Sequence, residues 1–331
     1  MESNNKTKIT IIVPCYNNEA YVKKCLESIK NQLFQNYEVI IINDGSKDNS
    51  QSIIEEFIKG DQRFKLFNQE NKGVSTARNN GLNEATGEYV CFVDADDYIE
   101  NNYLSRLLES IEESNSDLCI CSVIHEKLDG STIYIDQLES KTISSRETAN
   151  QKKLIWGYAC NKLYKLSIIK HNQIFFNPSI KFAEDELFYL TYLFSVEKVC
   201  FIADPLYHYV RQSQSATKNK RNLDVQANRF DSRNIIIKLL KKNNVDSYVI
   251  KKHIESCIDT CLLLFAYKYK GSQLSKEQKK KYLNYIKENK KVYLSDKEIN
   301  WKAKFFLRLA CFSLIIYKPI RRIHLKLTHR W

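Results

Sequence analysis

The sequence predicts an α/β fold in which a mostly parallel sheet carries helices on both faces. Short runs of apolar, β-branched residues alternate with segments whose apolar residues recur at helical spacing. Several of these runs end in clusters of Pro, Gly, Asn and Asp, as strands do where a loop begins. With 331 residues and 43% hydrophobic content, the chain is long and apolar enough to bury a substantial core. Strands that alternate with helices in this way form parallel sheets.

The first half contains the clearest elements. Residues 9–13 form a continuously apolar run, which is typical of a buried parallel strand. Further strands are predicted at residues 39–42, 64–67, 88–93 and 117–123. Helices are predicted at residues 20–29, 48–58, 75–85 and 103–111. Residues 124–182 are less regular, with 156–165 the most distinctive stretch, and then a helix that opens at 182–186 and runs to 194 and strands at 199–202 and 206–210 follow.

Beyond Arg211 the chain changes to Lys-rich helical segments, among which residues 275–278 match a capping box. The net charge of +12 is unevenly spread, because residues 211–331 carry +20 and the preceding residues carry −8. A basic region after an acidic body indicates a second role, such as contact with an anionic membrane or a nucleic acid. No apolar run reaches the ~20 residues that a membrane-spanning helix needs.

Cysteine usage and the N-terminus favour a reducing cytoplasm. The ten cysteines show neither an even disulfide framework nor paired zinc-site spacing. The first eight residues are polar and lack the apolar core of a signal peptide.

Acidic residues directly follow the strand at 88–93. Asp94, Asp96 and Asp97 lie within four residues, and such carboxylates repel one another unless a cation or water stands between them. A hard divalent ion with a bound diphosphate is one solution, and a solvated Asp-rich turn is the other. The Asn-Asp-Gly-Ser segment after residues 39–42 has the composition of an ordinary turn, yet Asp44 there can accept a hydrogen bond from a nucleobase. Tyr16 likewise offers a ring for stacking on a base.

A second group of polar residues lies further along the chain. Glu184 and Asp185 head a predicted helix, where acidic residues favour the helix dipole, but a positioned carboxylate there can also act as a general base. His208 and Arg211 end the last predicted strand. A lone histidine is usually structural, although beside a metal diphosphate His208 becomes a candidate ligand and Arg211 a candidate phosphate clamp.

In this order the segments resemble the family 2 glycosyltransferases, which have the glycosyltransferase A fold. The motifs that carry the resemblance are residues 11–17, 43–48, 71–81, 85–89 and 94–97. The resemblance is strong over residues 8–110 and fair over 156–215. Each motif is common alone, and five in this order are highly specific.

The resemblance implies a nucleotide-sugar site in the first half. Pro14, Tyr16 and Asp44 correspond to residues that hold the nucleobase. Asp94 and Asp96 correspond to the Asp-x-Asp positions, which contact the ribose and a divalent metal, Mn²⁺ or Mg²⁺, on the diphosphate.

The resemblance also covers later residues, with two departures from the family pattern. Arg78 lies in the donor-side segment, and Glu184 with Asp185 is similar to the acidic pair whose Asp acts as catalytic base. His208, as a metal ligand, and Arg211 match the segment placed against the diphosphate. Asn43 stands where many members carry a second Asp, and Ala183 stands where Gly is common.

The activity that the resemblance implies is an inverting, metal-dependent transfer of a hexose from a nucleotide donor, mainly a UDP-sugar, to a hydroxyl of a glycan or lipid-linked acceptor in surface-polysaccharide biosynthesis. We expect a catalytic domain at residues 1–215, with a donor half at 8–110 and an acceptor half at 111–215, and a helical region at 216–331.

Other functions remain as alternatives. A sugar-phosphate nucleotidyltransferase has a similar topology, but it would carry a Gly-rich, basic phosphate loop where this chain has residues 14–18. A non-catalytic, membrane-tethered binding module would be expected to lack Asp96 or Asp185, and both are present. The basic C-terminal region has no nucleic-acid recognition motif, so we expect no nucleic-acid partner.

The last thirty residues predict contact with a membrane. Residues 302–331 contain eight Lys and Arg, no acidic residue, and the apolar run 309–317. This run is too short to span a bilayer, but basic flanks around an apolar stripe fit a helix in an anionic membrane surface. We therefore predict a peripheral protein on the inner face of the cell membrane. The alternative is a helix packed on the protein's own body.

Overall fold

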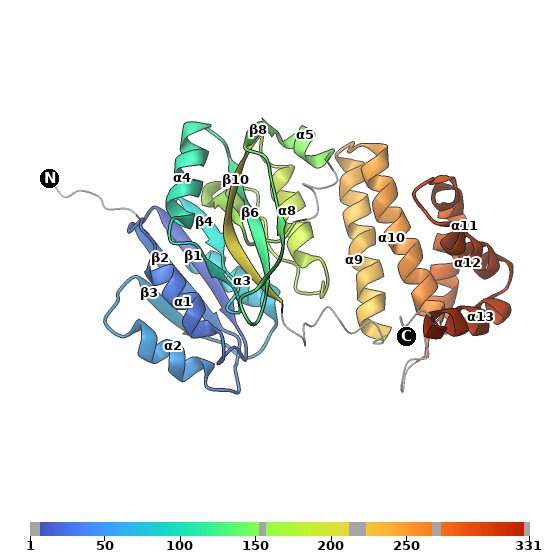
Figure 1. Cartoon of the computed structure of the whole chain (residues 1–331), viewed down its shortest axis with the longest axis horizontal. Helices are drawn as coiled ribbons and strands as arrows, with labels where there is room; N and C mark the ends of the chain where they lie inside the picture. The colour runs from blue at the N-terminus through green and yellow to red at the C-terminus, as the bar shows by residue number, and fades with distance from the viewer. Residues whose placement is uncertain (1–6, 152–156, 212–222, 267–272, 328–331) are drawn as a thin grey trace. The chain divides into compact units, whose positions relative to one another are not determined.

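The computed structural model describes residues 7–151, 157–211, 223–266 and 273–327. The chain divides into two compact units (Figure 1). The first comprises Met1–Ser179 and Glu184–Ser215, and the second comprises Ile180–Ala183 and Ala216–Trp331. The first is an α/β unit and the second is helical. The boundary that the sequence predicts, at residue 215, lies outside the described residues.

A single sheet organises the first unit. Its strands are β1 (Ile9–Cys15), β2 (Tyr37–Asn43), β3 (Phe64–Asn68), β4 (Tyr89–Phe92), β5 (Tyr98–Ile99), β6 (Leu118–Lys127), β7 (Thr132–Asp136), β8 (Lys141–Ser144), β9 (Lys162–Lys165) and β10 (Lys198–Arg211). Within the described residues the order is β3-β2-β1-β4-β9-β6-β10-β5, with β7 on β6 and β8 on β10. The pairs β1–β2, β1–β4, β2–β3 and β6–β10 are parallel, so the predicted mostly parallel sheet is confirmed.

Helices cover both faces of this sheet (Figure 1). They are α1 (Val22–Lys30), α2 (Ser50–Ile58), α3 (Val74–Glu84), α4 (Tyr103–Glu113), α5 (Ser145–Ala149), α7 (Leu166–His171) and α8 (Glu184–Leu193). Alternate residues of a strand point to opposite faces. Ile11 of β1 therefore joins Leu26 of α1 in one core, whereas Ile12 faces Gly81 of α3, where a Cβ atom would collide with the Ile12 side chain.

Two parts of the first unit differ from the sequence expectation. Residues 124–182, for which the less regular sequence predicts no elements, contain the end of β6 and the short elements β7, β8, α5, β9 and α7. The strands predicted at 199–202 and 206–210 are one strand, β10, with register shifts on either side of Pro205. Proline has no N–H to donate to a ladder, so it is placed where the pairing is already interrupted.

The second unit consists of helices around an apolar core of its own. They are α9 (Leu223–Lys242), α10 (Ser247–Ala266), α11 (Lys276–Ser295), α12 (Trp301–Phe312) and α13 (Leu314–Leu327). The predicted capping box is confirmed, because Ser275 and Gln278 exchange side-chain and backbone hydrogen bonds at the start of α11. In the described part of the chain, every helix is too short or too polar to cross a bilayer. All ten cysteines are free thiols, in agreement with the absence of a disulfide framework in the sequence.

Candidate active site

The acidic turn that follows β4 is held in place by β10. The carboxylate of Asp97 accepts hydrogen bonds from the backbone N–H of Val210 and from the hydroxyl of Tyr207, both at 2.8 Å. The same hydroxyl accepts a hydrogen bond from the backbone N–H of Asp94 at 3.2 Å. The Asp97 carboxylate therefore helps to fix the turn that carries Asp94 and Asp96.

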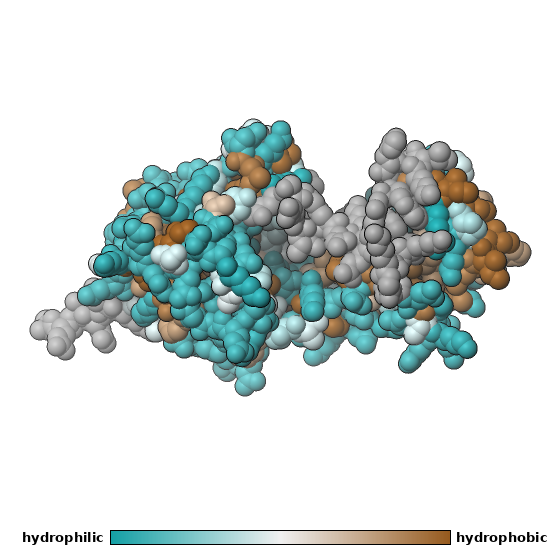
Figure 2. Space-filling model, turned by 90° about the horizontal axis from the view of Figure 1, so that it is seen from below, coloured by the Kyte–Doolittle hydropathy of each residue, from teal (hydrophilic) through white to brown (hydrophobic). Residues whose placement is uncertain are grey.

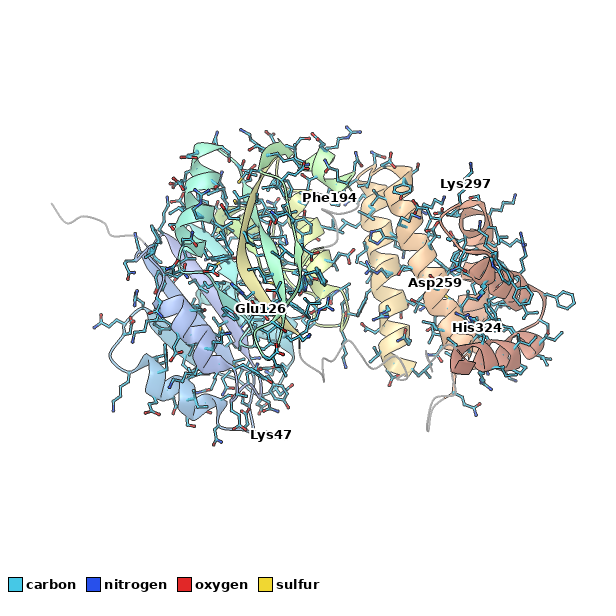
Figure 3. All side chains as sticks on the ribbon, viewed as in Figure 1. Lys47, Glu126, Phe194, Asp259, Lys297 and His324 are labelled. Carbon is cyan, nitrogen blue, oxygen red and sulfur yellow. The ribbon has the colours of Figure 1, made fainter. Side chains whose placement is uncertain are left out.

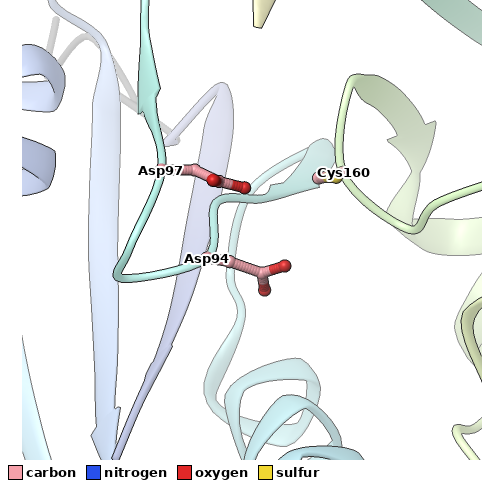
Figure 4. Close-up of side chains that lie close together, drawn as sticks. All are labelled: Asp94, Asp97 and Cys160. Carbon is pink, nitrogen blue, oxygen red and sulfur yellow. The ribbon is translucent and has the colours of Figure 1, made fainter. Parts of the chain in front are cut away.

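Asp94 and Asp97 face Cys160, which precedes β9 (Figure 4). One potential ligand atom from each of the three side chains lies within 4.8 Å of the others. Burial raises the pKa of the Cys160 thiol well above its usual value, so this sulfur stays protonated and is a poor metal ligand. Burial, followed by the charge of Asp94, raises the pKa of Asp96 to about 6. Burial and the neighbouring carboxylate thus disfavour the ionised form of Asp96.

Arg78 of α3 joins this turn to the acidic pair at the start of α8. Its guanidinium lies 2.7 Å from Oδ1 of Asp94, 2.6 Å from Oδ1 of Asp185 and 3.8 Å from Oε1 of Glu184. The arginine side chain is 4% exposed and lies 5.2 Å from the centre of the Phe176 ring. Burial opposes its charge, but the three carboxylates outweigh that effect and raise the pKa of Arg78. One buried cation therefore connects acidic residues that are far apart in the sequence.

Glu184 and Asp185 are positioned by the way that α8 begins. Ala183 has φ = +59°, in the left-handed region that favours glycine. The glycine that is common here in the resembling family fits this geometry, and Ala183 adopts it with some strain. Burial, followed by the charge of Asp185, raises the pKa of Glu184 to about 7, while Arg78 lowers it. A carboxyl group with such a pKa exchanges protons readily near neutral pH.

Of the residues predicted to hold a nucleobase, Tyr16 and Asp44 lie in the loops that follow β1 and β2, and Pro14 lies near the end of β1. Pro14 is buried within β1, and the Tyr16 side chain is 43% exposed. Both carboxylate oxygens of Asp44 are engaged, because Oδ1 accepts from the N–H of Lys72 and Oδ2 from the N–H of Gly73, each at 2.8 Å. Asp44 thus anchors the loop before α3. The exposed ring of Tyr16 is available for stacking.

Gly45 explains part of the second motif. It has φ = +70°, and a Cβ atom there would lie 2.8 Å from the backbone nitrogen of Asn71. A buried carboxylate explains the motif at residues 85–89, because Glu38 of β2 accepts hydrogen bonds from the backbone and hydroxyl of Thr86 at 2.8 and 2.7 Å. These motif residues shape the backbone around the site.

His208 and Arg211 are not among the residues that Arg78 brings together. The ring nitrogens of His208 lie 3.0 Å from Glu126 of β6, which Figure 3 labels, and 2.8 Å from Glu100, and the His208 ring stacks on Tyr98. Since neighbouring residues of a strand face opposite sides, Tyr207 contacts the acidic turn and His208 does not. Arg211 donates a hydrogen bond to the Tyr134 hydroxyl at 2.6 Å.

The sequence did not single out Tyr207 or Cys160 as site residues. The sequence did contain a signal for Tyr207. Residues 207–209 read Tyr-His-Tyr on a predicted strand, so Tyr207 and His208 point to opposite faces and only one of them can contact the acidic turn. Cys160 lies in the distinctive stretch 156–165, but no spacing in that stretch pointed to the thiol itself.

Comparison with known proteins establishes the family. The family model for glycosyl transferase family 2 matches residues 10–172. The glycosyltransferase GlyG of Streptococcus pneumoniae serotype 4 is 31% identical over 228 residues, which are 65% of this chain and 74% of that protein. The chain belongs to the family 2 glycosyltransferases, as the resemblance indicated. It spans about three fifths of the length of the curated relatives that it matches first.

Solved structures share the fold. The crystal structure of Staphylococcus aureus TarS residues 1–349 in complex with UDP-GlcNAc matches with a TM-score of 0.63 and 22% identity, covering 86% of this chain and 81% of that one. The mannosyltransferase PcManGT from Pyrobaculum calidifontis, in complex with GDP-Man and Mn²⁺, matches with a TM-score of 0.53 and 15% identity, covering 88% of each chain. These likenesses confirm the predicted glycosyltransferase A fold with a helical C-terminal region.

Proposed function

We propose that the chain transfers a hexose from a UDP-sugar to a hydroxyl group of a glycan or lipid-linked acceptor during synthesis of a surface polysaccharide, with inversion at the anomeric carbon. The observation that carries the proposal is the guanidinium of Arg78, which holds Asp94 beside Asp185 in one buried cluster. Membership of the family supports the reaction class, and the UDP-GlcNAc complex of TarS supports the donor class. We assign catalysis to residues 1–215 and a helical accessory region to residues 216–331.

The proposed reaction is a single displacement. Asp185 takes the proton of the acceptor hydroxyl while that oxygen bonds to the anomeric carbon and the bond from this carbon to the diphosphate breaks. The diphosphate leaves with the electron pair of the broken bond. Arg78 keeps the Asp185 carboxylate oriented through the 2.6 Å contact, and Arg211 at the end of β10 is the proposed diphosphate-binding cation.

The acidic turn fits a divalent cation, Mn²⁺ or Mg²⁺. Three carboxyl groups lie together in this turn, where burial and then the charge of Asp94 raise the pKa of Asp96 to about 6, and a cation would relieve the repulsion among their ionised forms. Carboxylate oxygens are the ligands that such hard ions prefer. Asp96, with Asp94, would hold the ion, which when bound neutralises charge on the leaving diphosphate. The Mn²⁺ complex of PcManGT supports this proposal.

The test is transfer by the purified chain from a panel of UDP- and GDP-sugars in the presence of Mn²⁺, with Asp96→Ala as the critical variant. We expect Asp96→Ala to abolish transfer and most metal-dependent UDP binding. Glu113→Ala, which removes an exposed acid from the end of α4, is the matched control and should leave both unchanged. Full activity of Asp96→Ala, or of the wild type in excess chelator, would refute the metal assignment.

The same assay separates the alternatives. UDP binding without turnover of any donor would favour a catalytically inactive binding module. Release of pyrophosphate from a nucleoside triphosphate and a sugar 1-phosphate would favour a nucleotidyltransferase. Neither alternative is supported by the comparisons, which find named glycosyltransferases.

We further propose that α12 and α13 attach the protein to the anionic inner face of the cell membrane. The two helices expose large apolar side chains, namely Trp301, Phe305, Phe312, Ile315, Ile316, Ile320 and Ile323. Their basic side chains that remain at least partly exposed are Lys302, Lys304, Arg308, Lys318, Arg321 and Arg322. Figure 2 shows hydrophobic residues gathered on the surface of the second unit. An apolar surface with basic neighbours and no acid fits an anionic interface. Co-sedimentation with vesicles tests this attachment.

The structure also changes how the tail must be tested. The predicted tail, residues 302–331, is two helices that meet at Ser313, and residues 328–331 lie outside the described residues. Leu307 and Tyr317 are buried in the core of the second unit, and the Tyr317 hydroxyl donates to the carbonyl of Leu262 at 2.6 Å. Deleting the tail would therefore expose that core. Substituting the exposed apolar side chains of the tail tests membrane attachment without removing the buried ones.

A further inference from the structure

A cavity of about 720 Å³ opens in the first unit, between β6, the segment that includes β7, and the residues before β9. Its volume falls within the range of about 300–1,000 Å³ that is usual for small-ligand pockets. None of the residues predicted from the sequence to bind the donor or to catalyse transfer lines it. The lining residues that matter to the argument are Gln137, Glu139, Lys141, Tyr158, Asn161 and Lys162.

The cavity shares a wall with the acidic turn. Tyr158, Asn161 and Lys162 line the cavity, and Cys160 of the same segment lies within 4.8 Å of ligand atoms of Asp94 and Asp97. A ligand in the cavity would therefore be separated from the carboxylate cluster by one short segment. An acceptor longer than one sugar could occupy the cavity with one unit while the unit beyond this segment reaches the carboxylate cluster.

The aromatic residues around this wall form a continuous group. The Tyr158 ring stacks with Tyr209 of β10 at a centroid distance of 5.6 Å, and Tyr209 also packs 5.2 Å from His125. His125 in turn stacks on Tyr134 of β7 at 4.2 Å. Sugar rings present apolar C–H faces and polar edges, so a pocket that combines an aromatic side chain with amide groups suits them.

The charges of the residues that line the cavity indicate whether a neutral or an anionic acceptor fits it. Among the described lining residues, Asp136 and Glu139 balance Lys141 and Lys162, which leaves no net charge. Lys162 is buried, and its ammonium group donates hydrogen bonds to the carbonyl of Tyr158 at 2.7 Å and to Oδ1 of Asn161 at 2.8 Å. Burial lowers the pKa of Lys162 to about 8. This lysine therefore fastens the wall of the cavity, and the lining residues that the structure describes form no cationic patch for a phosphodiester.

We propose that this cavity is a subsite for the acceptor and that it binds a neutral saccharide unit, with Tyr158 against the sugar ring and Gln137, Glu139 and Lys141 at its hydroxyl groups. The inference rests on the function proposed above, because it names the acceptor class of the same enzyme. It predicts that a polyol phosphate does not occupy this cavity.

The test uses the full chain with UDP present and measures binding by saturation-transfer difference NMR. The neutral probes are the methyl glycosides of glucose, galactose, mannose and N-acetylglucosamine, and the anionic probe is glycerol 1-phosphate. We expect at least one glycoside to bind and glycerol 1-phosphate not to compete with it. Losing one uncharged hydrogen bond should weaken glycoside binding by roughly 3- to 10-fold in Gln137→Ala.

Two further variants make the outcome decisive. Glu139→Ala removes an exposed lining side chain, so it should weaken glycoside binding without disturbing the fold, whereas Gln137 also donates a hydrogen bond to the carbonyl of Ala203. Glu113→Ala, which lies outside the cavity, should bind the glycosides as the wild type does. Affinity for UDP should be the same in all variants.

The outcomes also separate this inference from the proposed function. Absence of glycoside binding, equal binding by both cavity variants and the wild type, or displacement by glycerol 1-phosphate overturns the inference while sugar transfer stands. Glycoside binding that both cavity variants weaken, in a chain that turns over no nucleotide sugar, supports the cavity as a saccharide site and overturns the proposed transfer reaction.

Discussion

Replacement of Arg78 by Met removes the only charge that links the acidic turn to the acidic pair within the described part of the chain. The methionine side chain fills much of the same space beside Phe176 but donates no hydrogen bond. Asp94 and Asp185 then lose partners at 2.7 and 2.6 Å, and the third carboxylate, Glu184, loses a cation at 3.8 Å. We expect the first unit to be destabilised and transfer to be lost.

The magnitude follows from the burial of the partners. Removing one partner of a buried ion pair costs about 3–5 kcal/mol, because the remaining charge stays buried without compensation. The side chains of Asp94 and Asp185 are 25% and 24% exposed, so water solvates them in part. We therefore expect a loss at the lower end, about 3 kcal/mol in the free energy of unfolding.

The loss should depend on pH. The pKa of Glu184 is already raised to about 7 in the folded chain, above its ordinary value of 4.5, by burial and by Asp185. Arg78 opposes this rise, so its removal raises the pKa further. A carboxyl group with a raised folded pKa destabilises the fold when it is ionised, and stability returns as the pH falls through that pKa towards the unfolded value. The variant should therefore lose most stability above about pH 7 and least near pH 5.

Urea unfolding followed by circular dichroism, at about pH 8 and about pH 5.5, measures both effects. Arg106→Met is the control, because Arg106 is 40% exposed and pairs with Glu109 and Asp204 on the surface, where such pairs contribute about 1 kcal/mol or less. A loss for Arg78→Met no larger than that of the control at the higher pH would refute the argument. So would equal losses at the two pH values.

Two other predictions concern the base and the tail. Asp185→Asn should lower turnover by ~100-fold or more while UDP affinity persists, and the opposite pattern, in which Glu184→Gln alone stops turnover, would make Glu184 the base. Phe312→Ser with Ile315→Ser should reduce co-sedimentation with anionic vesicles, whereas Leu33→Ser, which changes an exposed leucine of the first unit, should not. Equal binding of the wild-type chain to neutral and anionic vesicles would contradict the electrostatic part of the membrane proposal.

Sequence patterns predicted the central elements because their signals are local. The strand at residues 9–13 is buried along its whole length, as its continuous apolar run indicates, and α1 buries the residues that recur at helical spacing. The elements that were missed lack such signals. All five residues of β7 are exposed, and its apolar run, Ile133–Ile135, is only three residues long, which is too short to mark a strand. It exists because it pairs with β6 at the edge of the sheet.

The sequence predicted which residues belong to the candidate site, but not which of them contact one another. The sequence named Arg78, Asp94 and Asp185, but only the fold shows that one guanidinium holds both carboxylates, across 107 residues of chain in the case of Asp185. For His208 the sequence predicted a contact that the structure does not show. Its position in a motif led to its prediction as a metal ligand, whereas the structure pairs it with Glu100 and Glu126. Its role as a metal ligand stays a prediction, and it would require His208 to exchange a carboxylate partner for the ion.

The tail shows why charge and hydropathy alone left two interpretations open. The sequence of residues 302–331 combines basic and apolar side chains. This composition suits both a membrane-bound helix and a helix that packs in the core. The helical backbone is interrupted at Ser313, so α12 and α13 are separate helices. Each of them buries some of these side chains and exposes others. Tyr317 is fully buried, whereas Ile315, two residues earlier on the same helix, is 86% exposed. The buried side chains stabilise the second unit. The exposed ones form an apolar surface, which the neighbouring basic residues would direct to an anionic membrane.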